Sequence, residues 1–274
     1  MDYRTVEPDF HDFEHAGWER AADHYGDAFG SLTSQTIPAL LRAAAVQRGT
    51  RLLDVASGPG YVAAEAAKLG ASAVGVDFAA EMVALASKKN PSLTFQEGDA
   101  EALPYADRSF DAVAINFGVL HLARPDTALA EAHRVLRSGG RCAFTVWAAP
   151  DISVGFGIVL EAIETHGRMD VPLPAGPPFF RFSDEAEAAR SMAAVGFSAP
   201  QVEMVPLVWR LPSGDALCDA FLQGAVRTAA LLRAQTPDAM AGIRRAIVEA
   251  AERYRTGSRI ELPMAAVLTS GTRP

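Results

Sequence analysis

The chain has 274 residues, of which 49% are hydrophobic and 21% are charged. This composition is typical of a folded globular protein, and it excludes intrinsic disorder, a collagen-like repeat and, with only two cysteines, a disulfide scaffold. The 33 acidic and 25 basic residues give a net charge of −8. Because an acidic surface repels a phosphate backbone, we do not expect nucleic acid to be the main partner.

No segment of the sequence resembles a membrane span or a targeting signal. Residues 1–15 are acidic and lack the apolar stretch of a signal peptide. No run reaches the roughly 18 apolar residues that cross a bilayer. Cys142 lies in an apolar run, far in sequence from Cys218, which favours two reduced thiols. We therefore expect a cytoplasmic protein with no membrane partner.

The first half of the chain predicts helices followed by alternating strands and helices. Residues 1–48 are expected to be mainly helical and to end in an amphipathic helix from Thr36 to Val46. The predicted strands that follow are 51–57, 72–77, 92–99, 110–116 and 141–147, and the predicted helices are 61–70, 79–90 and 125–136. This alternation indicates βαβ units around a parallel sheet with right-handed connections.

The second half is less regular. The predicted elements are a helix and a proline-rich loop in 150–182, a helix in 183–195, a strand in 202–211, two long helices in 214–255 and a strand in 259–271. Ser183 or Asp184 could cap the second of these helices. Pro206 places its strand at an edge or a bulge, and Thr236 and Pro237 separate the two long helices. The predicted fold is an α/β, Rossmann-like, mostly parallel seven-stranded sheet with helices on both faces, plus a helical cap.

The first chemical signal is the glycine-containing turn that joins the first predicted strand to the first predicted helix of the sheet. It runs from Asp54 to Gly60, with the sequence DVASGPG. A strand that ends in glycines and leads into a helix lets the backbone approach a ligand and directs free helix N–H groups at it. The spacing Gly58-x-Gly60-x-x-Ala63 also satisfies the dinucleotide-binding pattern G-x-G-x-x-A.

Polar side chains follow the next three predicted strands at the point where each one ends. Asp77 ends the second strand, Asp99 follows the third, and Asn116 ends the fourth. The carboxyl ends of parallel strands share one edge, where open α/β sheets bind ligands. A carboxylate at Asp77 could accept hydrogen bonds from a ribose diol, and Asp99 could bind an adenine amino group. Together the four strand ends predict a nucleotide-like ligand site.

At these residues the chain resembles the class I S-adenosylmethionine-dependent methyltransferases, in the type 11 branch that includes the ubiquinone/menaquinone C-methyltransferases. The motifs that carry the resemblance are DVASGPG (54–60), VGVD (74–77), EGDAEALPYADRSFD (97–111) and VLRSGG (135–140). They fall within residues 50–147. Ala56 departs from the family pattern by replacing the first glycine, and Ser138 replaces the usual proline.

The resemblance implies a cofactor, S-adenosyl-L-methionine, with S-adenosyl-L-homocysteine as the product, and a set of binding residues. Residues implied at the methionine and ribose parts are Ala56, Gly58 and Gly60, with Asn116 and Phe117 at the methionine end and Tyr25 at its carboxylate. Residues implied at the ribose hydroxyls and the adenine are Asp77, Phe78, Met82, Asp99 and Ala100. In this family a helical segment before the core folds over the cofactor, which is why Tyr25 belongs to the set.

Few residues have the character of catalytic or metal-binding groups. Methyl transfer from a sulfonium needs alignment and desolvation, and it needs a base only when the nucleophile must lose a proton. His121, just past the fourth strand, is the candidate base; alternatively it is a structural histidine that caps the next helix. His11 and His15 could share one helix face as metal ligands do, but no third ligand is evident, so no metal site is predicted. Large apolar side chains concentrate in the additions to the core, at Phe156, Phe179, Phe180, Phe182, Trp209 and Phe221. The stripe Leu217, Phe221 and Ala225 is expected to be mainly core packing, although part of this set could line an apolar substrate pocket under the cap.

The sequence therefore predicts a methyltransferase that acts on a small apolar or aromatic molecule. The expected segments are an N-terminal helical cap segment (1–48), the cofactor-binding core (49–149), a cap insert (150–182), a core continuation (183–212), a helical cap insert (213–256) and the last core strand (257–274). One alternative is an NAD(P)-dependent oxidoreductase, in which Asp99 has no role. Another is a non-catalytic protein that binds S-adenosylmethionine. The sequence does not specify the acceptor, the choice among O-, N- and C-methylation, or the oligomeric state.

Overall fold

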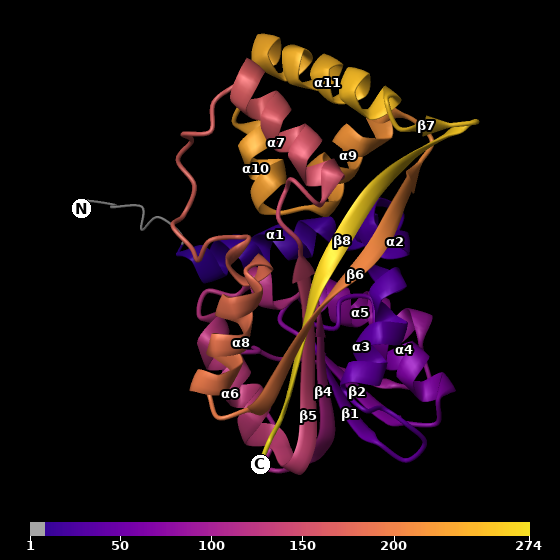
Figure 1. Ribbon diagram of the computed structural model, residues 1–274, viewed down its shortest axis with the longest axis vertical. Coiled ribbons are helices and arrows are strands. Elements are labelled where there is room, and N and C mark those ends of the chain that lie inside the picture. Colours follow the sequence, from indigo (N-terminus) through magenta and orange to yellow (C-terminus); the bar gives the residue numbers. More distant parts are fainter. Residues whose placement is uncertain (1–8) are drawn as a thin grey trace, which may run out of the picture.

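The computed structural model describes residues 9–274, so the first eight residues of the expected cap segment lie outside the described part (Figure 1). A single twisted sheet has the strand order β3-β2-β1-β4-β5-β8-β6, and the short strand β7 pairs with β8 off this path. The strands are β1 (Arg51–Val55), β2 (Ser72–Asp77), β3 (Thr94–Glu97), β4 (Phe110–Asn116), β5 (Leu136–Trp147), β6 (Ser198–Leu211), β7 (Arg255–Thr256) and β8 (Arg259–Thr272). Strands β1 to β5 pair in parallel, and β8 is antiparallel to β5 and β6. This confirms the predicted mostly parallel sheet.

Helices cover both faces of the parallel strands (Figure 1). These helices are α3 (Ile37–Ala43), α4 (Tyr61–Lys68), α5 (Ala80–Lys89), α6 (Pro125–Val135) and α8 (Glu185–Ala194). Alternate residues of β1 serve opposite faces, since Leu52 joins the apolar cluster under α3 and α4 while Leu53 joins the cluster under α6. Both leucines are fully buried, as expected for a strand covered on each side. The Asp184 carboxylate caps α8 by accepting from the Glu187 N–H.

Two predicted boundaries are wrong for local reasons. The helix predicted from Thr36 to Val46 ends at Ala43, because Ala45 adopts a left-handed conformation with φ of 55°. Strand β5 begins at Leu136 instead of residue 141. Its pairing with β4 shifts register between Phe110 and Ala112, so the predicted turn at 138–140 is an irregularity within the strand.

The last two long strands form the antiparallel edge of the sheet. Strand β6 pairs only with β8 within residues 9–274, and Pro206 lies opposite Ala265 in that pairing. The edge position predicted from Pro206 is therefore confirmed. Proline has no backbone N–H to donate, and on an edge strand this missing donor can face away from the sheet, so that no hydrogen bond between strands is lost. Strands β6 and β8 continue upward beyond the parallel strands and reach the helices at the top of Figure 1.

A layer of helices lies over the upper end of the sheet (Figure 1). It consists of α7 (Val154–His166), α9 (Gly214–Gly224), α10 (Arg227–Arg233) and α11 (Pro237–Glu252), with the 3-10 turn η4 (Arg181–Ser183) leading back to α8. The prediction of two long helices in 214–255 is wrong, because Ala225 is extended and divides α9 from α10. Gly224 at this break lies against the α1–α2 connection, where an added Cβ would be 2.5 Å from Ala28. Thr236 caps α11, so the helix boundary predicted at Thr236 and Pro237 is confirmed.

The N-terminal segment runs between this helical layer and the sheet. It consists of α1 (Phe10–Tyr25), the π-helical turn η1 (Gly26–Gly30), α2 (Ser31–Thr33) and the 3-10 turn η2 (Ser34–Thr36), followed by α3. Helix α1 contacts both α5 of the core and α9 of the helical layer. Its side chains can therefore reach the strand ends from above. The domain boundaries given above stay a prediction.

Two further expectations concern membranes and thiols. Within the described residues, no helix has the length and apolar character required to cross a bilayer. Cys142 and Cys218 are both buried and unbonded. Burial raises the pKa of the Cys142 thiol to about 12, so this group is inert at neutral pH. The cytoplasmic location stays a prediction.

Candidate functional site

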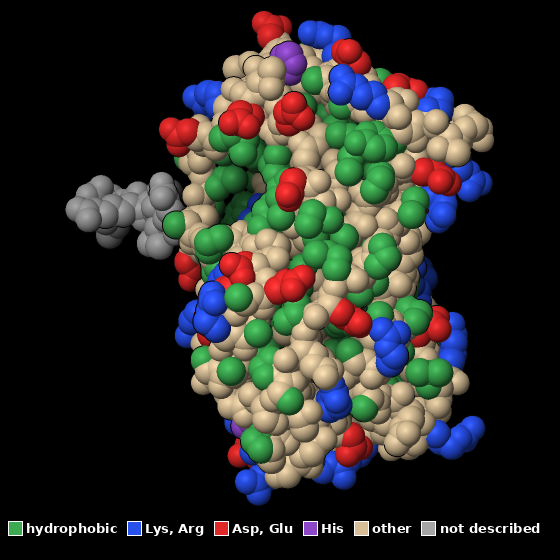
Figure 2. Space-filling view, viewed as in Figure 1, with side chains coloured by type: hydrophobic (Ala, Val, Ile, Leu, Met, Phe, Trp, Pro, Cys, Tyr) green, Lys and Arg blue, Asp and Glu red, His purple; other side chains and the backbone are tan. Residues whose placement is uncertain are grey.

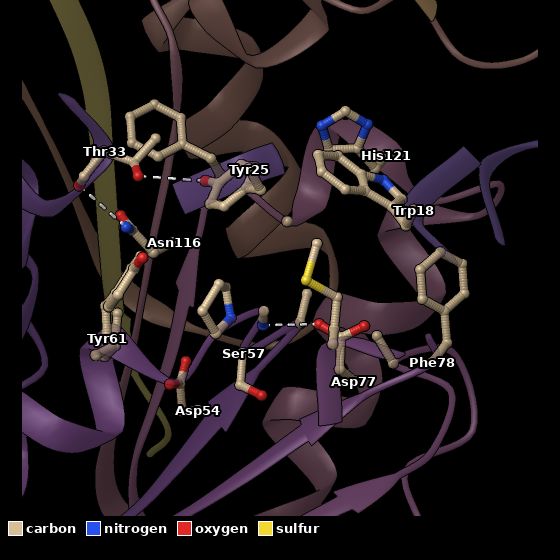
Figure 3. Close-up of a pocket in the computed structure, with 18 of the residues that line it drawn as sticks. Trp18, Tyr25, Thr33, Asp54, Ser57, Tyr61, Asp77, Phe78, Asn116 and His121 are labelled. Carbon is tan, nitrogen blue, oxygen red and sulfur yellow. Dashed lines mark hydrogen bonds between the residues drawn. The ribbon is translucent and has the colours of Figure 1, made fainter. Parts of the chain in front are cut away.

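A cavity of about 810 Å³, including its open mouth, lies at the carboxyl ends of β1, β2 and β4 (Figure 3). Every residue predicted for the site except Gly60 lines it: Tyr25, Ala56, Gly58, Asp77, Phe78, Met82, Asp99, Ala100, Asn116, Phe117 and His121. Residues that line it without having been predicted include Trp18, Thr33, Asp54, Ser57 and Tyr61. The sheet edge thus brings together the strand ends that the sequence singled out, while α1 adds the wall above them.

The two glycines of the turn serve different purposes. Gly58 has a φ of 49°, and a Cβ placed on it meets nothing within 4 Å, so the backbone is bare on the cavity side. Gly60 has a φ of 79° and precedes α4, where a Cβ would lie 2.6 Å from the Phe95 ring. The need for glycine at position 60 therefore comes from packing against β3. Its predicted contact with a cofactor stays a prediction.

Ala56, which replaces the usual first glycine, has its methyl group accommodated by a neighbouring strand end. Its φ is 52°, in the left-handed region that favours glycine. A Cβ on Gly118 would lie 2.6 Å from the Ala56 Cβ. Gly118 therefore provides the space that the alanine methyl occupies. The two positions form a pair that spacing within the motif could not reveal.

Asp77 is held by two backbone groups at the end of β2. Its Oδ2 accepts from the Gly58 N–H at 2.8 Å, drawn in Figure 3, and its Oδ1 accepts from the Ala79 N–H at 3.0 Å. Each oxygen keeps a further lone pair for a ligand hydroxyl. Burial raises the pKa of Asp77 to about 6, while these hydrogen bonds act in the opposite direction. The carboxyl group is thus fixed in orientation and is an anion at neutral pH.

Asp54 and Ser57 add buried polar atoms on either side of the glycine turn. The Asp54 Oδ2 accepts from the Ala63 N–H at 3.0 Å and so ties the end of β1 to α4. Burial raises the pKa of Asp54 well above its usual value. The Ser57 hydroxyl is buried and has no hydrogen-bond partner among residues 9–274. An unpartnered hydroxyl beside the cavity is consistent with a polar ligand there.

Asn116 anchors the segment after α1 to the strand ends. Its Oδ1 accepts from the Thr36 and Thr145 hydroxyls, each at 2.7 Å, and its Nδ2 donates to the Thr33 carbonyl at 3.2 Å. The Tyr25 hydroxyl donates to the Thr33 Oγ1 at 3.2 Å, on the same side of the cavity (Figure 3). Burial raises the pKa of Tyr25 to about 12, so it is a neutral phenol there. Sequence reasoning missed Thr33, because no strand end or motif marks it.

Helix α1 also covers the opposite end of the cavity. The His11 Nε2 lies 3.2 Å from the Asp99 Oδ2, and the Asp99 Oδ1 accepts from the Glu101 N–H at 2.8 Å. The rings of His11 and His15 both meet Phe78 edge-on. The two histidines do not form a ligand pair; instead His11 has ligand atoms within 4.8 Å of those of Asp9 and Asp12. That group is partly exposed, and nothing else among residues 9–274 points to an ion there.

His121 takes part in a buried charged cluster at the top of the cavity. Its Nδ1 lies 2.9 Å from the Glu14 Oε2, and the Arg227 Nε donates to the Glu14 Oε1 at 2.7 Å. Glu14 has no exposed surface. The Trp18 ring meets the His121 ring edge-on at 4.7 Å, and Figure 3 shows the two side by side across the cavity from Asn116. Neither Glu14 nor Arg227 was singled out in the sequence.

A second cavity of about 430 Å³ adjoins the first under the helical layer. Its shared wall consists of Trp18, Tyr25, Thr33, Phe117 and His121, and its remaining lining includes Phe29, Trp147, Phe156, Phe179 and the stretch 224–228. No carboxylate lines it within the described residues, and Arg227 is its charged side chain. Of the apolar residues noted in the additions to the core, Phe156, Phe179 and Ala225 line this cavity. Trp209, Leu217 and Phe221 are fully buried, as core packing predicts.

A further hollow adjoins the second cavity. It shares Phe156, Phe179, Arg227 and Thr228 with it and is otherwise lined by side chains of α7, α10 and the segment between α7 and η4. Figure 2 shows a hollow with hydrophobic side chains around it in this part of the face.

The strand–helix segment that contains the glycine turn matches known proteins. Residues 53–144 match a family described as "Methyltransferase domain". The chain is 45% identical over 101 residues to a demethylmenaquinone methyltransferase of Chlorobaculum parvum. The aligned segment covers 36% of this chain and 42% of that protein. A demethylmenaquinone methyltransferase of Beutenbergia cavernae is 41% identical over 112 residues, or 41% of this chain and 47% of that protein. The chain thus spans less than half the length of these relatives.

Solved structures resemble almost the whole chain. The 4+2-cyclase SpnF superposes with a TM-score of 0.60 at 20% identity, covering 97% of both chains. A Haemonchus contortus phosphoethanolamine N-methyltransferase, solved with S-adenosyl-L-methionine, gives a TM-score of 0.58 at 19% identity and covers 97% of this chain and 60% of that one. At these identities the likeness shows the fold. Residues 53–144 are a class I methyltransferase domain of the type 11 branch, and the predicted resemblance is confirmed for this part of the chain.

Proposed function

We propose that the protein binds S-adenosylmethionine in the first cavity and transfers its methyl group to a small apolar or aromatic molecule in the second. The observation that carries this proposal is the shared wall of Trp18, Tyr25, Thr33, Phe117 and His121. Two ligands that meet at a common wall are held close enough to react, which is the main requirement for a displacement with an activated leaving group.

The residues of the first cavity fit such a cofactor. Asp77 presents free lone pairs for a ribose diol, Asp99 has an oxygen at the far end for an adenine amino group, and Gly58 leaves space for a close backbone contact. When bound, the cofactor supplies a methyl group on a positively charged sulfur. The binding roles predicted for Ala56, Phe78, Met82, Ala100, Asn116, Phe117 and Tyr25 are supported by their place in the cavity lining.

The second cavity supports an uncharged acceptor with an apolar ring. Its lining is mostly aromatic, and aromatic side chains bind flat apolar rings by stacking and edge contacts. The curated relatives are named for demethylmenaquinone, a quinone, which agrees with a ring-shaped acceptor.

Fold alone does not determine the reaction, since one neighbour with this fold is named as a cyclase. The test is therefore a binding comparison followed by turnover. S-adenosylhomocysteine at about 100-fold over its Kd should stabilise the protein by roughly 2.7 kcal/mol, or on the order of 5–10 °C in melting temperature. NAD and NADP should give no shift, and the reverse result would exclude the methyltransferase proposal in favour of an oxidoreductase. Binding without methyl transfer to any aromatic acceptor would favour the non-catalytic alternative.

A further inference from the structure

The Glu14 carboxylate joins three elements that are distant in sequence. Glu14 lies on α1, His121 in the 3-10 turn η3 (Val119–His121) and Arg227 at the start of α10. The carboxylate uses one oxygen for each partner, at 2.9 Å to the His121 Nδ1 and 2.7 Å to the Arg227 Nε. Because Glu14 has no exposed surface, removing either partner would leave its buried charge incompletely paired, which costs more than breaking a surface pair.

Several contacts fix the Arg227 guanidinium next to Glu14. Besides Glu14, its guanidinium donates to the carbonyls of Pro177 and Leu120, each at 2.7 Å. Its plane also lies over the Phe10 ring at 4.3 Å. A guanidinium with its donors occupied in this way acts as a fixed support and has little left to offer a ligand.

The cluster keeps Glu14 ionised. Burial by itself raises the pKa of Glu14, but the adjacent His121 and Arg227 more than offset it, so that the net pKa is lowered. An ionised carboxylate only accepts hydrogen bonds. The Nδ1 of a neutral His121 must therefore carry the proton, and its Nε2 carries the lone pair.

The Nε2 of His121 is left for a ligand. No residue among 9–274 forms a hydrogen bond with it, and the His121 side chain keeps 14% of its surface exposed. His121 lines both cavities, at the wall they share. Among the described residues the charged groups that face its ring are Glu14 from α1 and Arg227 from α10, while Trp18 and Phe179 complete its surroundings.

We propose that Glu14 and Arg227 are positioning residues that hold His121 as a general base, and that the acceptor is an uncharged aromatic molecule methylated on a hydroxyl oxygen. This inference rests on the proposed function and specifies its acceptor. In the step, the acceptor O–H gives its proton to the His121 Nε2 and the oxygen forms a bond to the methyl carbon. The carbon–sulfur bond breaks with its electron pair going to sulfur, so a neutral thioether and an imidazolium remain.

The chemistry of the second cavity favours a hydroxyl over an amine. A base is needed only when the nucleophile carries a proton that must leave. A protonated amine would require a carboxylate as a partner, and none lines the second cavity in the described part of the chain. A neutral hydroxyl needs one acceptor at the shared wall, and the His121 Nε2 supplies it.

The experiment uses 4-nitrophenol as the probe, because its phenolate absorbs visible light whereas the phenol and its methyl ether do not. We expect saturable binding in the presence of S-adenosylhomocysteine, with a phenolate fraction that falls in His121→Asn and in Glu14→Gln. With S-adenosylmethionine, 4-nitroanisole should form, and His121→Asn should lower the rate by about 10²-fold or more. Glu14→Gln should lower it less, about 10-fold, and should be partly rescued by Glu14→Asp.

The control is His24→Asn on the same helix, at an exposed position outside both cavities, which should leave every readout unchanged. Because Glu14→Gln leaves the partly buried Arg227 without its counter-ion and could unfold the chain, the tautomer of His121 is also measured in the wild-type protein by ¹⁵N NMR. A proton on Nδ1 supports the proposal, and a proton on Nε2 overturns it.

The remaining outcomes are also decisive. Equal phenolate fractions in the wild type and His121→Asn would overturn the base role. A lack of saturable 4-nitrophenol binding, or methylation on a ring carbon, would overturn the acceptor class. In each of these cases retained binding of S-adenosylhomocysteine leaves the proposed function standing, whereas loss of that binding in the wild type would overturn the proposed function itself.

Discussion

The two cavities are built in opposite ways. The first is lined mainly by residues between Asp54 and Leu122, at and just after successive strand ends, with Trp18, Tyr25 and Thr33 added by the N-terminal segment. The second is formed by large side chains from α1, the end of β5, α7 and the 224–228 stretch. Under the proposed function, the cofactor site therefore depends on a local motif, whereas the acceptor site depends on how distant segments pack. We infer that the first site is fixed by sequence pattern and that the second is free to vary with the cap.

This difference decides which features the sequence could predict. Strand ends and positive-φ glycines have local signatures, so Gly58, Asp77 and Asp99 were found from spacing alone. The Glu14 contacts to His121 and Arg227 span 107 and 213 residues. No local pattern encodes such separations, and an isolated glutamate on a helix is indistinguishable from a surface residue.

Two glycines show why local pattern is not enough. Gly224, at the unpredicted break between α9 and α10, lies against Ala28, almost two hundred residues earlier in the chain. Gly60 satisfies the motif spacing, and its position against Phe95 leaves no room for a Cβ. In both cases tertiary contact, and not local propensity, determines what the glycine does.

The largest expected effect separates the two glycines of the turn. Gly60→Ala places a methyl group against Phe95 at a φ of 79°, so we expect a loss of roughly 2–5 kcal/mol in the free energy of unfolding from left-handed strain and overpacking. Gly58→Ala meets no neighbour and should lose only about 1–2 kcal/mol, but its methyl group should weaken binding of S-adenosylhomocysteine. Urea titration and calorimetry measure the two effects.

If Gly58→Ala were the more destabilising of the pair, or if it left cofactor affinity unchanged, the cavity would not be a backbone-built cofactor site. The claim that a local sequence motif forms the first cavity as a cofactor site would then be wrong.

A smaller effect concerns pH. Since burial raises the pKa of Asp77 to about 6, the carboxylate that accepts from a ribose hydroxyl is lost as pH falls through that value. We expect S-adenosylhomocysteine affinity to fall by up to about 10-fold per pH unit below pH 6, as measured by calorimetry from pH 5 to 8. In the free protein the folded state binds the extra proton, so the stability contribution of Asp77 declines as pH rises from about 4 to 6.

Asp77→Asn should remove this pH dependence of binding, because the amide does not titrate. A variant whose affinity still changes through the same window would assign the titration to another group, and the site would then depend on more than the strand ends.

The most direct test of the central claim is a calorimetric titration of S-adenosylhomocysteine into the wild type, Asp77→Ala and Glu97→Ala. Glu97 is the matched control, because it pairs with Asp77 in the β2–β3 register but is exposed and does not line the cavity. We predict that Asp77→Ala weakens binding by at least about 10-fold, as the loss of a charge-assisted hydrogen bond requires, while Glu97→Ala binds like the wild type and both variants stay folded. Equal affinity in all three proteins would contradict the assignment of the cofactor site.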